Sequence, residues 1–231
     1  MLLYANGCSM TLGDEMSDPR RTCFPTLVAE HFGFDLHNDA HSGASNCRIL
    51  RTTLLWLADY LGKGGDPADL FVMIGWTAPG RREFGLSEEE GSIDSNYFWR
   101  NIFVHCQLEG ASPDLLKLHK LVFGSFACAR ESMSRLLVAA TSLQGVLASH
   151  GIRYCFHHTM PVLAVHAEAE PLASALDTRR FHRFLGNKSD FLSSCISLWN
   201  LPIGPKSHPL EEGHRRWAAE LIDFIEKGRL L

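Results

Sequence analysis

Residues 69–76, with the sequence DLFVMIGW, decide the fold. Every residue from Leu70 to Ile74 is apolar, and no polar residue alternates with them. A strand with one face in water alternates, whereas a strand of a parallel sheet covered on both faces is a continuous apolar run. The stretch therefore predicts a central strand of a parallel sheet.

The sequence on both sides of this strand alternates further strands with helices. Short apolar runs predict strands at 2–6, 34–38 and 152–158. Apolar residues three or four positions apart predict helices at 24–32, 46–61, 129–150 and 211–228. This alternation favours an α/β fold with a doubly wound parallel sheet, in a single domain that spans residues 1–231.

The segment from Pro79 to about Ser125 interrupts the alternation. It is acidic at 88–90 and then aromatic at Tyr97, Phe98 and Trp99. A long irregular stretch in a compact domain is usually a functional lid or an interface. We expect a lid, whose aromatic residues line an apolar substrate pocket, or a subunit contact that forms a homodimer.

Composition limits the function classes. The chain has 231 residues, 45% of them hydrophobic, and a net charge of −4. Disorder is excluded, and there is no basic excess for nucleic-acid phosphates. The seven cysteines form no CxxC pair, and no apolar run is long enough for a signal peptide or a membrane span. We expect a cytoplasmic protein with reduced thiols and without a nucleic-acid or membrane partner.

Ser9 stands where the first expected strand turns into a helix. In an open parallel sheet, ligands bind beyond the carboxyl ends of the strands. Residues 7–13, GCSMTLG, follow such an end. A hydroxyl on a glycine-flanked turn is exposed, and the amides of the turn point outward, where they can receive an oxyanion. Ser9 is a candidate nucleophile, and its alternative role is to cap the helix.

His208 is the candidate base that such a serine requires. It lies in a loop just before the last expected helix, and Pro209 fixes the chain beside it. The alternative is an ordinary surface histidine. His214, six residues later, is expected to pack within the helix. His157 and His158 are adjacent on a strand and point to opposite faces, so no metal site is expected there, and no cofactor is expected.

Other strand ends supply candidate ligand contacts. Gly43 lets a backbone N–H approach a ligand, and Asn46 either caps the following helix or donates to the substrate. Trp76 and Thr77 end the 69–76 strand, where we expect Trp76 to contact substrate and the Thr77 hydroxyl to donate a hydrogen bond.

Arg81 and Arg82 follow the same strand end. Either guanidinium suits a bidentate contact with a substrate carboxylate or phosphate. The alternative is a solvated pair of arginines in a loop, bridged to Glu83.

The ordered motifs GCSMTLG at 7–13, SGASN at 42–46, GWT at 75–77 and His208-Pro209 resemble the SGNH or GDSL hydrolase family. They are most similar to a bacterial and phage branch that opens with GCSxTxG. The resemblance implies a three-layer α/β/α, flavodoxin-like fold. It also implies Ser9 as nucleophile, His208 as general base, and the amides of Ser9 and Gly43 as oxyanion-hole donors.

Two positions depart from the family pattern. Thr77 stands where the family has an oxyanion-hole asparagine, so we expect its hydroxyl to be the third donor. The family places an aspartate two or three residues before the histidine, where this chain has Lys206 and Pro205. For efficient hydrolysis, a backbone carbonyl or a carboxylate from elsewhere in the chain would be needed to orient His208 in place of this aspartate.

These observations lead to three hypotheses. The first is a serine esterase or deacylase that acts on a small-molecule ester or acyl substrate. The second is an acyltransferase that uses the same serine and excludes water under the 79–125 segment. The third is a catalytically weak binding protein on a hydrolase scaffold, in which no group orients His208.

Overall fold

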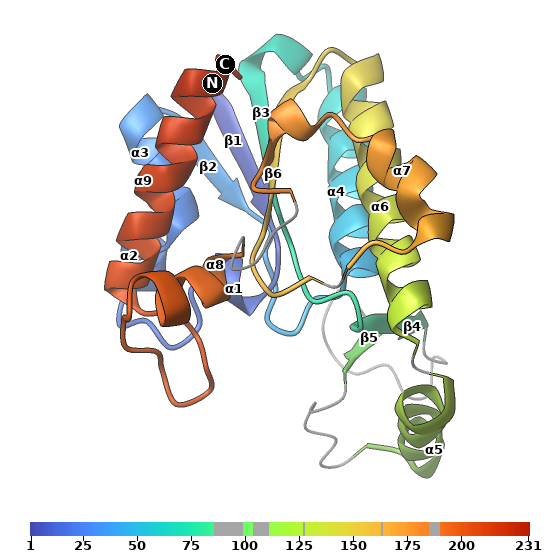
Figure 1. The fold of residues 1–231 in the computed structure, drawn as a ribbon. Coiled ribbons are helices and arrows are strands. Elements are labelled where there is room, and N and C mark those ends of the chain that lie inside the picture. The colour runs from blue at the N-terminus through green and yellow to red at the C-terminus, as the bar shows by residue number, and fades with distance from the viewer. Residues whose placement is uncertain (86–98, 104–110, 127, 163, 185–189) are drawn as a thin grey trace.

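The computed structural model describes residues 1–85, 99–103, 111–126, 128–162, 164–184 and 190–231. Its central sheet has five strands in the order β2-β1-β3-β6-β7, and all neighbouring pairs are parallel (Figure 1). The strands are β1 Leu2–Asn6, β2 Asp35–Asn38, β3 Leu70–Trp76, β6 Arg153–His158 and β7 Phe181–His182. The parallel, doubly wound sheet expected from the sequence is confirmed.

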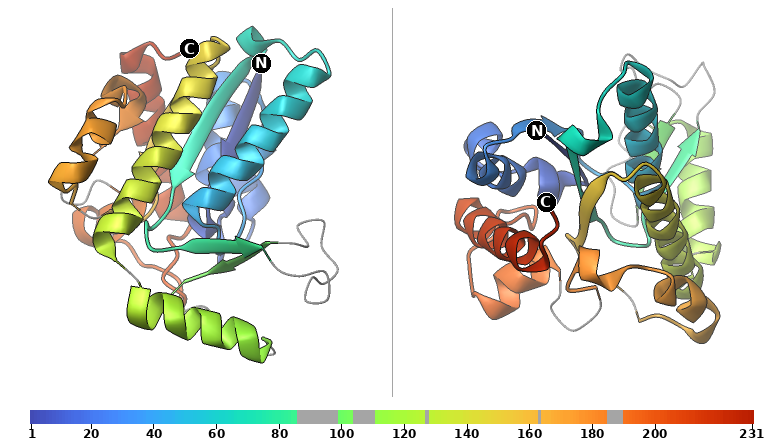
Figure 2. Two further views of the ribbon diagram at one scale, coloured as in Figure 1. Left: turned by 90° about the vertical axis from the view of Figure 1, so that its right-hand side faces the viewer. Right: turned by 90° about the horizontal axis from the view of Figure 1, so that it is seen from above.

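Helices cover both faces of the sheet, which makes three layers (Figures 1 and 2). One face carries α3 Phe24–Phe32 and α9 Glu211–Gly228, and the other carries α4 Asn46–Gly62 and α6 Ala129–Ser149. The shorter helices are α1 Ser9–Leu12, α2 Pro19–Thr22, α5 Pro113–Leu121, α7 Glu170–Ser174 and α8 Phe191–Ser193. Single 3-10 turns are Pro67–Asp69, Ala167–Ala169 and Thr178–Arg180, and π-helical turns are Val122–Phe126 and Ser194–Leu198.

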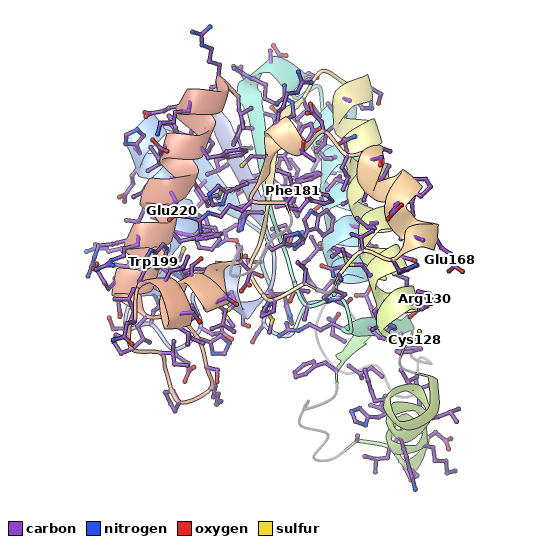
Figure 3. All side chains as sticks on the ribbon, in the orientation of Figure 1. Cys128, Arg130, Glu168, Phe181, Trp199 and Glu220 are labelled. Atoms are coloured by element: carbon purple, nitrogen blue, oxygen red, sulfur yellow. The ribbon has the colours of Figure 1, made fainter. Side chains whose placement is uncertain are left out.

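The burial of β3 explains its apolar sequence. All seven of its residues are buried between the two helical layers. On one side α9 contributes Trp217 and Leu221, both fully buried. Phe181 of β7, near the middle of the molecule in Figure 3, packs against Phe156 with ring centroids 5.9 Å apart. The central strand and its helices thus form one continuous core.

The described parts of the 79–125 segment lie beyond the carboxyl ends of the strands (Figures 1 and 2). It contains a two-stranded antiparallel sheet, β4 Arg82–Gly85 with β5 Trp99–Ile102, and then α5. Tyr97 and Phe98 lie outside the described residues, and so does the side chain of Trp99. The lid and the homodimer contact stay predictions.

The expected elements agree with the structure to within two residues at each end. The sequence patterns did not indicate β4, β5, β7 or any short helix other than the one expected at Ser9. In the described part of the chain, no helix has both the length and the apolar character that crossing a membrane requires.

Candidate active site

A cavity of about 780 Å³ opens at the carboxyl ends of the strands. Its wall takes Ser9 from the segment after β1, Gly43 from the segment after β2, and Arg81 from the segment after β3. Met160, which follows β6, and His208, which precedes α9, complete it. The structure therefore brings the expected nucleophile, base and glycine into one cavity.

Asn6 fixes the turn that carries Ser9. This side chain is fully buried at the end of β1. Its Oδ1 accepts a hydrogen bond from Gly7 N at 2.8 Å, and its Nδ2 donates to Thr52 Oγ1 at 2.9 Å. A Cβ on Gly7 would lie 2.0 Å from Thr11 Oγ1, so only glycine fits this approach. Ser9 is consequently held as the first residue of α1.

Glu15 is the carboxylate behind His208. Its Oε2 lies 2.7 Å from His208 Nδ1 and accepts a hydrogen bond from His208 N at 3.2 Å. Its Oε1 accepts a hydrogen bond from Lys206 N at 2.9 Å. The Glu15 and His208 side chains are 12% and 13% exposed, so the contact is largely shielded from water. This contact orients the imidazole through Nδ1, which leaves Nε2 as its other reactive nitrogen.

Backbone geometry around this pair is unusual on both sides. Glu15 has φ +70° and Ser207 has φ +67°, a region that costs a non-glycine residue about 1 kcal/mol or more. Gly204 N donates to His208 O at 2.8 Å, and a Cβ on Gly204 would lie 2.7 Å from the Glu15 carboxyl carbon. The loop is shaped to receive this carboxylate.

The ionisation of Glu15 suits this contact. Burial alone would raise the pKa of the Glu15 carboxyl, but the hydrogen bonds from Lys206 N and from the His208 side chain and backbone lower the pKa below its ordinary value. The carboxylate therefore stays charged beside the imidazole at neutral pH.

Sequence reasoning did not identify Glu15. The expected acid stands two or three residues before His208, whereas the chain supplies it 193 positions away, immediately after the short helix of Ser9. The sequence feature that indicates a carboxylate near the site is the Asp14-Glu15 pair, which follows the GCSMTLG motif after the first strand. Only the fold brings that pair to the loop before α9.

Gly43 lines the cavity, whereas the Thr77 hydroxyl is hydrogen-bonded within the protein. Gly43 has φ +75°, a conformation that favours glycine. Thr77 is fully buried, and its hydroxyl donates to Met160 Sδ at 3.5 Å. The structure thus supplies a reason for glycine at position 43, while it directs the Thr77 hydroxyl to a sulfur atom instead of a ligand.

Asn46 supports the wall of the cavity from behind. Its Oδ1 accepts a hydrogen bond from Thr77 N at 2.9 Å, and its Nδ2 donates to Thr77 O at 3.0 Å. The residue is buried, and Ser45 is the residue that caps α4, accepting from Arg48 N. Asn46 therefore does not cap the helix and does not present its amide to a ligand.

Trp76 and Arg82 are also placed away from the cavity. Trp76 is fully buried in β3 and packs edge-on against Phe156. Arg82 is buried and donates to Glu131 and to Pro79 O. Neither expected substrate contact is available, because one side chain fills the core and the other is engaged by the protein.

We predict that Asn46→Ala lowers the free energy of unfolding by about 2–4 kcal/mol, because it leaves the buried Thr77 N–H and C=O without their partner. Asn46→Asp keeps the acceptor for Thr77 N but places a buried carboxylate oxygen against Thr77 O, so it should also destabilise the protein. Urea unfolding followed by circular dichroism measures both. Equal stability of Asn46→Ala and wild type would contradict this role.

Buried histidines occur elsewhere in the molecule. His157 and His158 are buried at the end of β6, and His214 accepts a hydrogen bond from Phe24 N at 3.1 Å within the core. Cys8, next to Ser9, is fully buried and contacts Thr159 Oγ1. In the described ranges no three His, Cys, Asp or Glu side chains group as metal ligands would.

Solved structures with this fold include several hydrolases. The chain is similar to the psychrotrophic esterase EstA from Pseudoalteromonas sp., with 13% identity, a TM-score of 0.53, and coverage of 98% of this chain and 97% of that one. It is also similar to a protein assigned to the lipolytic G-D-S-L family from Desulfitobacterium hafniense DCB-2, with 11% identity, a TM-score of 0.51, and coverage of 96% and 98%. A third is TesA, with 12% identity, a TM-score of 0.50, and coverage of 99% and 99%.

At such low identity these matches concern the fold alone, and they establish the three-layer α/β fold found in SGNH hydrolases. No curated protein matches the sequence. A family model covers residues 10–230, which include Glu15, Gly43 and His208. The chain therefore belongs to DUF6071, a family of unknown function.

Proposed function

We propose that the protein is a serine hydrolase that cleaves an ester or acyl bond with Ser9, His208 and Glu15. The observation that carries the proposal is the 2.7 Å contact between His208 Nδ1 and Glu15 Oε2 at a cavity that Ser9 also lines. A serine, an imidazole and an ionised carboxylate in this order are the parts that nucleophilic acyl chemistry needs. The hydrolase fold supports the same reading.

The reaction has two steps. The Ser9 oxygen attacks the acyl carbon while His208 Nε2 takes the hydroxyl proton, and the same nitrogen then gives that proton to the departing alcohol or amine. Water attacks the resulting Ser9 ester, again losing its proton to His208, and the acid is released as Ser9 regains its hydrogen. Glu15 holds the imidazole in one orientation and stabilises it while it is charged.

Backbone amides are the proposed oxyanion donors. The N–H groups of Ser9 and Gly43 belong to segments that line the cavity. The Thr77 hydroxyl is engaged with Met160, so it is not part of this proposal. Each well-placed donor is worth about 3–4 kcal/mol of transition-state stabilisation.

Labelling with a fluorophosphonate probe tests the nucleophile. Wild-type protein should be labelled at one site, and Ser9→Ala should not be labelled at all, because the probe requires an activated serine. Peptide mass spectrometry should place the adduct on Ser9. Ser17→Ala, a change at an exposed serine, should be labelled like wild type. Equal labelling of wild type and Ser9→Ala would reject the proposal.

Product analysis separates hydrolysis from acyl transfer. Hydrolysis releases only the free acid when an alcohol or amine acceptor is added to the reaction. A new ester or amide that forms in place of the acid would assign the protein to transfer through the same Ser9 intermediate.

A further inference from the structure

Among the residues that the structure describes, no carboxylate is paired with Arg81, in contrast to its neighbouring arginines. Arg51 forms an ion pair with Glu83 at 2.8 Å, and Arg82 is paired with Glu131. Within the described ranges, the Arg81 side chain makes no ion pair, and its one hydrogen bond runs from Nη1 to Ala44 O at 3.3 Å. A half-buried guanidinium that lines a cavity without a counter-ion attracts an anionic ligand.

Phe103 holds this guanidinium in place. The Arg81 Cζ atom lies 5.0 Å from the centroid of the Phe103 ring. A guanidinium stacked on an aromatic face keeps its edge free for a planar anion and loses little further freedom when it binds one. The stacking therefore prepares Arg81 for a carboxylate or phosphate in the cavity.

The position of Arg81 points to the acyl part of the substrate. Its hydrogen-bond acceptor, Ala44 O, is in the residue next to Gly43. A Cβ on Gly43 would lie 3.6 Å from Phe103 Cε1, so Gly43, Phe103 and Arg81 form one wall. This wall carries the proposed oxyanion donor, whereas His208, which would protonate the leaving group, enters from the loop before α9.

The rest of the lining fits a chain with an apolar body. Met10, Met160 and Leu192 line the same cavity. Its one described acidic side chain, Asp14, is engaged by the Ser42 hydroxyl. Lys206 adds a second cation to the lining. The described lining therefore combines apolar surface with an excess of positive charge.

We propose that the substrate is an ester whose acyl chain ends in an anionic group, with a carboxylate as the simplest case, and that Arg81 binds this group. The proposal rests on the proposed serine hydrolase function, because Arg81 and the nucleophile share the cavity. Arg81 is a specificity-determining residue and takes no part in bond making.

Two esters of equal chain length test the proposal. Mono(4-nitrophenyl) adipate carries a terminal carboxylate, whereas 4-nitrophenyl hexanoate does not. Wild-type kcat/KM should be at least about tenfold higher for the adipate ester, the size of effect expected for one charge-assisted contact. Arg81→Gln should lower kcat/KM for the adipate ester by about 10–100-fold and change that for the hexanoate ester by less than about threefold.

Control variants distinguish a loss of anion binding from a loss of folding or of general activity. The hexanoate rate in the same sample reports whether Arg81→Gln is folded and active. Arg81→Lys should keep part of the preference, since the charge remains without the planar fork. Arg21→Gln removes an 85% exposed arginine and should leave both rates unchanged.

Two results would overturn the proposal while the hydrolase function stands. One is equal wild-type kcat/KM for the two esters. The other is a preference that survives in Arg81→Gln and disappears in Lys206→Met, which would assign the anion to Lys206. Absence of hydrolysis of both esters, together with absence of Ser9 labelling, would reject the hydrolase function and this proposal with it.

Discussion

Glu15→Gln is expected to lower kcat for ester hydrolysis by about 10²–10⁴-fold, with KM changed by less than about threefold. Glu15 accepts from His208 Nδ1 and from the backbone N–H groups of Lys206 and His208. A glutamine has one oxygen for these three donors and no charge to stabilise an imidazolium. The loss should therefore appear in the chemical step, which steady-state kinetics with 4-nitrophenyl hexanoate measures.

A matched substitution separates this effect from a general loss of stability. Glu211 is another carboxylate that accepts from a backbone N–H, that of Ser17 at 2.9 Å, but it does not contact the imidazole. Glu211→Gln should keep kcat within about twofold of wild type.

A second variant disturbs the Glu15 carboxylate without changing Glu15 itself. Gly204→Ala places a Cβ 2.7 Å from the Glu15 carboxyl carbon and should also lower kcat without raising KM. Wild-type kcat in both Glu15→Gln and Gly204→Ala would show that Glu15 does not position His208.

The long elements could be predicted from the sequence because burial controls their composition. A strand covered on both faces must be apolar throughout, as β3 is, and a helix packed on a sheet must repeat its apolar residues every three or four positions, as α9 does. The pair β4 and β5 carries neither signal, since four-residue strands that pair mainly with each other bury too little surface to impose a pattern. The two-residue strand β7 was not predicted, for the same reason.

The site was predictable where a strand end or the start of a helix dictates position. Ser9 and Gly43 follow strand ends, His208 precedes α9, and all three line one cavity. The direction of a side chain was not predictable there: Trp76 and Thr77 turn into the core, and Asn46 turns toward Thr77. Glu15 depends on a contact across 193 positions, which no local motif encodes.

Lowering the pH from 7 to 5.5 is expected to reduce the free energy of unfolding by on the order of 5 kcal/mol. Four histidines are buried in or beside the aromatic core. Burial lowers the pKa of His158 and of His182 to about 4, lowers that of His214 to about 3, and lowers that of His157 well below its ordinary 6.5. Total stability of a domain is about 5–15 kcal/mol, so the loss is a large part of it.

The direction follows from where protons bind. Well above pH 6.5 these imidazoles are neutral in the folded and the unfolded chain, and they do not make stability depend on pH. Below pH 6.5 these histidines bind protons in the unfolded chain, whereas in the folded chain they bind protons only near pH 4 or below. Each buried histidine therefore lowers the free energy of unfolding by about 1.4 kcal/mol for each pH unit in this range. Burial raises the pKa of Glu220, which lies on α9 (Figure 3) with its carboxylate 3.7 Å from His182 Nε2. A raised carboxyl pKa makes the free energy of unfolding increase as the pH falls, so this one group offsets part of the loss.

His157 provides the sharpest test, because neither of its ring nitrogens has a hydrogen-bond partner in the described part of the structure. It packs against Phe24 and Trp217, so His157→Leu removes a titrating group without removing a hydrogen bond. Urea unfolding at a series of pH values should show about a quarter less pH dependence in His157→Leu than in wild type, whereas His150→Gln, at an exposed histidine, should behave like wild type. A wild-type free energy of unfolding that stays constant from pH 7 to 5.5 would mean that the folded chain already binds these protons, and that water or motion reaches the imidazoles in the core.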